Sequence, residues 1–227
     1  RQHDRNSNLA GVRMSRVHDM GGRFGDGPVD SDFGREHVFE EEWHGRAFAV
    51  TIASGFLGQW NLDESRHMRE CLSPKDYGRF SYYEKWLSGL ADILVAKEVV
   101  TKKELETLSP DIASEDLIAR VLKAKDVFSS LAKGGPTNRE EGYKALFKVG
   151  DIVTTCRAEN KYVAGGHTRL PNYASGKSGK IISCNGNHVF PDSNAHRAGE
   201  LPQPLYTVAF LAEVLWQHPE NPDDLVM

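Results

Sequence analysis

The sequence predicts an α+β protein, in which a helical first half precedes a small β-barrel. Before residue 140, apolar residues recur at steps of three and four, the spacing of amphipathic helices. After residue 140, short apolar runs alternate with glycine-containing turns, as in small barrels. We therefore expect an extended arm over 1–36, a helical domain over 37–135 and a barrel domain over 143–227.

The overall composition is typical of a soluble globular chain, with 39% hydrophobic and 26% charged residues among 227. The net charge of -4 and a pI near 6.2 argue against a general nucleic-acid binder, which usually carries a basic excess. No apolar run approaches the ~20 residues of a membrane span. The N-terminal stretch also lacks the apolar core of a secretory signal, so the expected location is the cytoplasm.

The arm is expected because residues 14–36 are rich in glycine. The stretch "HDMGGRFGDGPVDSDFG" holds five glycines in seventeen residues and can bury little surface of its own. Arms of this kind clasp a partner subunit, and the alternative is a mobile tail.

The helical domain is expected from residue 37 onwards. Apolar residues at helical spacing cover 37–57. Three later helix starts carry a capping box, in which a polar N-cap precedes a glutamate by three residues. These starts are Asn61 with Glu64, Ser81 with Glu84, and Thr101 with Glu104. A further helix is predicted from Glu115 to Lys133, with Gly134 ending it.

The barrel is expected to be of the SH3-like kind, because four or five short strands occupy about 80 residues. The stretch "GKIISCNGNHVF" predicts a hairpin that turns at Asn185-Gly186, since Asn-Gly is the strongest short turn signal. "LYTVAF" predicts another strand, and "LFKVGDIV" places a Gly-Asp turn between apolar residues.

The cysteines and histidines predict no metal site in this chain. Cys71, Cys156 and Cys184 lie far apart, without the spacing of a zinc site or a disulfide framework. His188 and His196 are close in sequence, but no third ligand follows them. There is no P-loop and no nucleophile motif, so the chain alone shows no complete active site.

Two arginines are candidate functional residues. Arg66 lies on a short capped helix. Arg169 lies in "GGHTRLPNYASGK", residues 165–177, where glycines allow close backbone approach and Pro171 limits the chain. A guanidinium held this way offers a planar fork of donors that suits paired oxygens. Because the sequence offers Arg169 no evident partner, we expect the oxygens to belong to another chain.

The ordered motifs of the chain resemble the β subunit of nitrile hydratase. The resemblance runs from about residue 16 to 216 and rests on the order of these pieces: "HDMGG", "EEW", "LDESRH", "SYYEKW", "FKVGDIV", "GHTRLPNYASGKSG", "HVFPDSNAHRAGE" and "PLYTVAF". Residues 1–13 fall outside it, and Met14 is a candidate natural start. The family usually continues past the position of residue 227. We therefore expect either that the barrel lacks its last strand or that the chain has been trimmed.

The resemblance implies an enzyme that converts small nitriles to amides, as an αβ heterodimer or α2β2 assembly. The partner α subunit would hold non-corrin Co(III) or Fe(III) on a C-x-x-C-S-C motif, with two cysteines oxidised to sulfinate and sulfenate. In the family, two β-subunit arginines donate hydrogen bonds to those oxygens. By motif position they correspond to Arg66 in "DESRH" and Arg169 in "GHTR".

The resemblance also implies two substrate-pocket residues. Tyr82, the first tyrosine of "SYYEKW", matches a tyrosine that reaches the pocket, and Leu62 matches an apolar pocket position. The family often has an aromatic residue before the first arginine, where this chain has Ser65. The shape of the pocket is therefore expected to differ.

Three other functions compete with this hypothesis. A metallochaperone or activator protein resembles the β subunit but is shorter. A thiocyanate-hydrolase-type subunit divides the β-like region between two chains. A nucleic-acid-binding module could use an SH3-like barrel, although the acidic balance of the chain counts against it.

Overall fold

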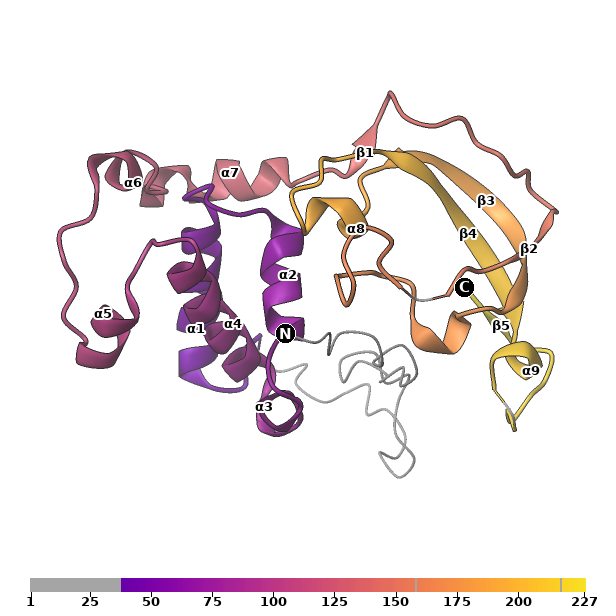
Figure 1. The fold of residues 1–227 in the computed structure, drawn as a ribbon, viewed down its shortest axis with the longest axis horizontal. Helices are drawn as coiled ribbons and strands as arrows, with labels where there is room; N and C mark the ends of the chain where they lie inside the picture. The colour runs from indigo at the N-terminus through magenta and orange to yellow at the C-terminus, as the bar shows by residue number, and fades with distance from the viewer. Residues whose placement is uncertain (1–37, 158, 217) are drawn as a thin grey trace, which may run out of the picture.

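The computed structural model describes residues 38–157, 159–216 and 218–227. Helices form the first half of the chain and an antiparallel sheet dominates the second, and the two parts lie at opposite ends of the molecule (Figure 1). The expectation of an α+β fold is therefore confirmed. The arm expected over 1–36 lies outside the described residues. Within the described residues, no helix combines the length and the apolar character needed to cross a membrane.

The helical part follows the order of the sequence motifs. Its elements are α1 (Glu42–Gly55), α2 (Leu62–Glu70), α3 (Pro74–Arg79), α4 (Tyr82–Ala96), α5 (Lys102–Thr107), α6 (Glu115–Ala119), the 3-10 helix η1 (Ala124–Asp126) and α7 (Val127–Lys133). All three expected capping boxes are present, at the starts of α2, α4 and α5. In α2, the Glu64 backbone N–H donates to Asn61 Oδ1 and the Asn61 N–H donates to Glu64 Oε2, each over 2.9 Å. Capping is local, which explains why sequence spacing located these starts.

The continuous helix predicted from Glu115 to Lys133 is wrong. The segment is broken into α6, η1 and α7, although Gly134 does follow the last helical residue with a φ of 61°. Its apolar side chains find little to pack against, since Ile118 is 56% and Phe128 is 86% exposed. Helices this short gain most of their stability from tertiary packing, so a periodic pattern without a packing surface does not produce one long helix.

The core of the helical part lies between α2 and α4. Trp60, Leu90 and Ile93 are buried there. At the crossing, Gly89 lets the two helices approach closely, because a Cβ at this position would lie 2.7 Å from Arg69 Cγ. The Arg69 guanidinium then lies over the Trp86 ring, 4.5 Å from its centroid. These contacts fix α2, the helix that carries Arg66, against the rest of the helical part.

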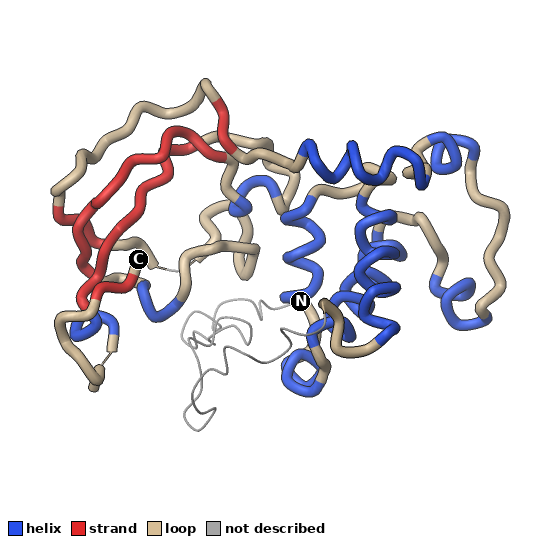
Figure 2. Tube along the Cα trace, turned by 180° about the vertical axis from the view of Figure 1, so that it is seen from behind, coloured by secondary structure: helices blue, strands red, loops and turns tan. Residues whose placement is uncertain are grey.

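The second half forms a five-stranded antiparallel sheet that curls into half of a barrel (Figure 2). Strands β1, β3, β4 and β5 follow one another across the sheet, and β2 also pairs with β3. The elements are β1 (Asn138–Arg139), β2 (Ile152–Thr154), the 3-10 helix η2 (Asn172–Ala174), β3 (Ser178–His188), α8 (Pro191–Asn194), β4 (Gln203–Leu211), α9 (Ala212–Leu215) and β5 (Leu225–Val226).

The hairpin predicted at Asn185-Gly186 is wrong. Strand β3 runs straight through these residues and pairs with β4 on both sides of them. Cys184 pairs with Tyr206 and Asn187 pairs with Pro204, so two residues of β3 oppose one residue of β4. This is a β-bulge, and Gly186 supplies the positive φ of 81° that such a bulge favours. The strand predicted from "LYTVAF" is confirmed as part of β4.

Candidate functional site

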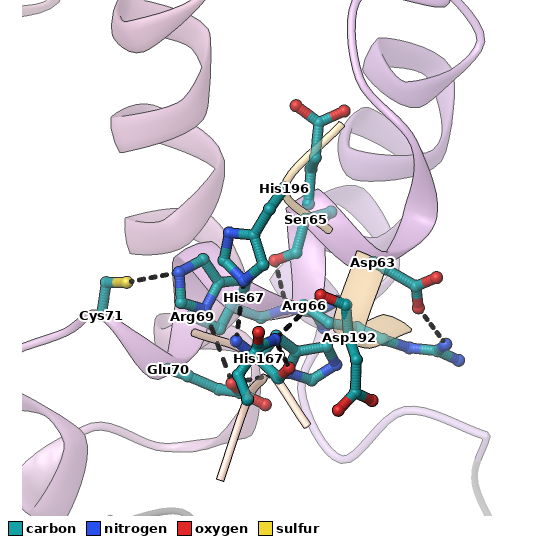
Figure 3. A network of polar contacts seen from close by, with 12 residues as sticks. Asp63, Ser65, Arg66, His67, Arg69, Glu70, Cys71, His167, Asp192 and His196 are labelled. Carbon is teal, nitrogen blue, oxygen red and sulfur yellow. Dashed lines mark hydrogen bonds and ion pairs between the residues drawn. The ribbon is translucent and has the colours of Figure 1, made fainter. Parts of the chain in front are cut away.

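Helix α2 presents Arg66 beside a buried carboxylate. The Arg66 side chain is 39% exposed, and its Nη1 donates to Asp63 Oδ1 over 3.1 Å (Figure 3). Asp63 is buried, and its other oxygen accepts a hydrogen bond from Asn194 Nδ2 over 2.9 Å. Among the described residues, no hydrogen bond uses the Nε and Nη2 donors of Arg66. Asp63 thus anchors one edge of the guanidinium, and the other edge is unused within the part of the chain that the structure describes.

Arg169 lies in a loop whose shape depends on two glycines. Gly165 has a φ of 72°, in the left-handed region that favours glycine. A Cβ at Gly166 would lie 2.6 Å from His196 Nε2 and 2.9 Å from Asn160 Cγ, so the close backbone approach expected from the sequence is present. Arg169 itself is exposed and has no hydrogen bond or ion pair within the part of the chain that the structure describes.

The two arginine-bearing segments meet through a cluster of ionisable side chains. His167 is fully buried, and its Nδ1 lies 2.6 Å from Glu70 Oε2 on α2. The His167 and His67 rings are 6.1 Å apart between centroids, and the His67 and His196 rings are 4.7 Å apart (Figure 3). The structure therefore places the end of α2 against the loop that leads to Arg169. Sequence reasoning missed this contact, because 97 residues separate Glu70 from His167 and neither has a distinctive spacing.

The surroundings of His67 favour its protonated form. Cys71 Sγ lies 3.6 Å from Nε2, and Glu70 Oε2 lies 3.7 Å from Nδ1. These two partners raise the pKa of His67 to about 9, against the opposing effect of burial. The C-terminal end of α2, where His67 lies, also favours a positive charge. His67 thus adds a positive charge beside Arg66, its neighbour on α2, at neutral pH.

We expect the stabilising effect of His67 to depend on pH. Its pKa in the folded chain, about 9, lies above the ordinary value of ~6.5, so its contribution to stability is complete below pH ~6.5 and lost as the pH rises through 9. Thermal unfolding of the wild type and a His67→Gln variant should therefore differ most at about pH 6 and converge above about pH 9. The matching His188→Gln variant, in a half-buried ring on β3, controls for the loss of an imidazole. If His67→Gln lowered the unfolding temperature by the same amount at about pH 6 and above about pH 9, the expectation would be contradicted.

His67, Glu70 and His167 are the described residues that come closest to a metal-ligand set, with one donor atom from each lying within 4.8 Å of the others. Their geometry favours hydrogen bonding instead. The 2.6 Å between His167 Nδ1 and Glu70 Oε2 is a hydrogen-bond length. The buried Nε2 of His167 has no hydrogen-bond partner among the described residues. His188 and His196 serve separate hydrogen bonds.

The two expected pocket residues lie at the starts of neighbouring helices. Leu62 is the first residue of α2 and is 60% exposed. Tyr82 is the first residue of α4 and is 63% exposed, with its ring centroid 5.1 Å from that of Tyr83 and 5.5 Å from that of Trp86. Both therefore offer apolar surface to a molecule outside the chain.

Comparison with known protein families identifies both halves of the chain. Residues 14–133 match the model of the nitrile hydratase beta subunit, N-terminal region, and residues 136–227 match the model of the C-terminal region of the same subunit. The chain belongs to the nitrile hydratase β-subunit family. The resemblance seen in the sequence motifs is confirmed. Nitrile hydratase is a hydro-lyase that acts as a complex with an α subunit, so the family is one of enzyme subunits.

Individual family members align over almost their whole length. The nitrile hydratase subunit beta of Pseudomonas putida is 38% identical over 214 residues, which cover 94% of each chain. The low-molecular weight cobalt-containing nitrile hydratase subunit beta of Rhodococcus rhodochrous is 33% identical, and the alignment covers 92% of this chain and 93% of that subunit.

The thiocyanate hydrolase subunit beta of Thiobacillus thioparus is 36% identical over only 90 residues, or 39% of this chain. The thiocyanate-hydrolase alternative is therefore supported only in part of the chain.

Proposed function

We propose that this chain is the β subunit of a nitrile hydratase, which hydrates small nitriles to amides at a Co(III) or Fe(III) centre held by a partner α subunit. The observation that carries the proposal is the pair of family matches, which together span 14–133 and 136–227. Two relatives are named as cobalt-containing, which supports a metal of this kind.

The proposed role of Arg66 and Arg169 is to donate hydrogen bonds to the oxidised cysteine oxygens of the α subunit. Hydrogen bonds from a guanidinium to such anions are charge-assisted and roughly twice as strong as neutral ones. Arg66 suits this role because Asp63 binds only its Nη1. Arg169 suits it because its exposed guanidinium has no partner in the described chain. The bound metal would supply Lewis acidity, while the arginines orient and neutralise its ligand oxygens.

Tyr82 and Leu62 are proposed to line the substrate pocket from this side. Their exposed positions at the starts of α4 and α2 support contact with a small apolar nitrile at the subunit interface. Four of the five strands of the curled sheet, β2 to β5, lie within 143–227 and support an SH3-like barrel there, preceded by a helical domain over 37–135. We further propose an αβ heterodimer, alone or doubled to α2β2, in the cytoplasm.

Co-expression of this chain with the α subunit tests the proposed function. We expect a stoichiometric complex that hydrates nitriles, contains cobalt or iron, and shows oxidised α-subunit cysteines in mass spectrometry. We expect no tightly bound stoichiometric metal on this chain once it is separated from α. Release of an active, metal-loaded α subunit without this chain would indicate an activator protein instead. Salt-dependent binding to nucleic acid without hydratase activity would favour the barrel-module alternative.

A further inference from the structure

The short helix α8 is hydrogen-bonded to the start of α2, beside which it lies (Figure 1). Asn194 Nδ2 donates to Asp63 Oδ2 over 2.9 Å, and Asn61 Nδ2 donates to the Asn194 carbonyl oxygen over 2.8 Å. Asp63 uses its remaining oxygen to accept the hydrogen bond from Arg66 Nη1. Arg66 is therefore connected to α8 through one buried carboxylate.

Helix α8 and the turn after it also hold the loop before Arg169. Asn160 is buried, and its Nδ2 donates both to the Asp192 carbonyl oxygen, over 2.9 Å, and to the His167 carbonyl oxygen. His196 Nε2 accepts a hydrogen bond from the His167 backbone N–H over 2.9 Å. The backbone N–H and carbonyl groups of His167, two residues before Arg169, are thus both tied to residues near α8.

Helix α8 is itself held firmly. Pro191 occupies its first turn, where the ring presets the helical backbone angle. Ser193 is 0% exposed, so the helix cannot shift without disturbing the interior. The Asp63–Arg66 pair, three residues apart on α2, could form without α8. However, the bond from Asn194 restricts the Asp63 carboxylate, and through it the direction of the guanidinium.

We propose that Asn194 and Asn160 are positioning residues that act through α8 to set the separation of Arg66 and Arg169. The proposal rests on the proposed function, because this separation matters only if both arginines meet one set of oxygens. Two donors that converge on one group require accurate placement, and a misplacement of about 1 Å can cost about a hundredfold in rate.

The first test is the Asn194→Ala variant in the assembled αβ complex. We expect kcat to fall about tenfold with little change in KM, because the altered group lies behind Arg66 and not in the pocket. The control is Ser193→Ala, a neighbouring buried residue of α8. Among the described residues, its hydroxyl donates to the Phe190 and Glu200 carbonyl oxygens and not to Asp63. Equal losses of kcat in both variants would mean that α8 is only structural, and would overturn the proposal.

A double-mutant cycle then asks whether Asn194 acts through Arg66. In an Arg66→Lys background, Asn194→Ala should cause little further loss, because coupled residues are not additive. The same tenfold loss in both backgrounds would overturn the proposal. A crystal structure of the Asn194→Ala complex provides a test that does not depend on enzyme activity. We expect it to show the Arg66 guanidinium moved by about 1 Å or more. An unmoved guanidinium overturns the positioning role, whereas full activity of Arg66→Lys overturns the proposed function of the arginine.

Discussion

The Arg66→Lys and Arg169→Lys variants are each expected to lower the turnover of the assembled αβ complex by roughly ten- to hundredfold. Lysine keeps the positive charge but loses the planar fork, so the substitution tests geometry as well as electrostatics. Loss of a charge-assisted bond to a buried anion costs about 1.5–3 kcal/mol, which corresponds to that range of rates if the bond acts in the transition state. Steady-state kinetics of the purified complex measures the effect.

Arg79→Lys is a matched control for Arg66→Lys. Arg79 lies on α3 and pairs with Asp76 three residues earlier, as Arg66 pairs with Asp63, but its side chain is 60% exposed. We expect turnover of the control to stay within about twofold of the wild type, because exposed pairs contribute little. Metal content should be unchanged in all three variants, since the ligands are proposed to lie in α. Near-normal turnover of both site variants, with sulfinate and sulfenate intact in mass spectrometry, would refute the proposed role of the arginines.

The Gly166→Ala variant is expected to destabilise the chain and reduce activity together. The added Cβ would meet His196 Nε2 at 2.6 Å, Asn160 Cγ at 2.9 Å and the Val163 carbonyl oxygen at 2.9 Å. Overpacking of this kind typically costs about 1–3 kcal/mol. Because the backbone on both sides of residue 166 must shift, Arg169 is expected to move as well. The variant should therefore show both a lower unfolding temperature and a lower turnover.

Gly78→Ala provides the opposite expectation at another glycine. Gly78 lies in α3 and a Cβ there would meet nothing within 4 Å, so alanine should stabilise the helix by up to about 1 kcal/mol. Thermal unfolding and kinetics of both variants check the pair. If Gly166→Ala behaved like Gly78→Ala, the loop around Gly166 would be far less constrained than the structure indicates.

The sequence by itself determined the features that depend on neighbouring residues. The capping boxes at Asn61, Ser81 and Thr101 were predictable, because an N-cap and its glutamate lie three residues apart. The sequence also predicted that the glycines of this loop allow a close backbone approach. It could not identify the atoms that a Cβ at residue 166 would meet. The motifs, in their order along the chain, were specific enough to indicate the family on their own.

Only the tertiary structure decided the features that depend on distant partners. The apolar spacing of 115–133 predicted one helix. In the structure the apolar side chains of this segment are largely exposed, so they lack the packing surface that would stabilise one long helix. Asn185-Gly186 suits both a hairpin and a bulge, and pairing of β3 with β4 selected the bulge. The contact of Glu70 with His167, and the bonds of Asn194 and Asn160 around α8, join segments far apart in the chain. Local spacing carries no information about which distant side chains share one buried, low-dielectric space, so these contacts appear only once the chain has folded.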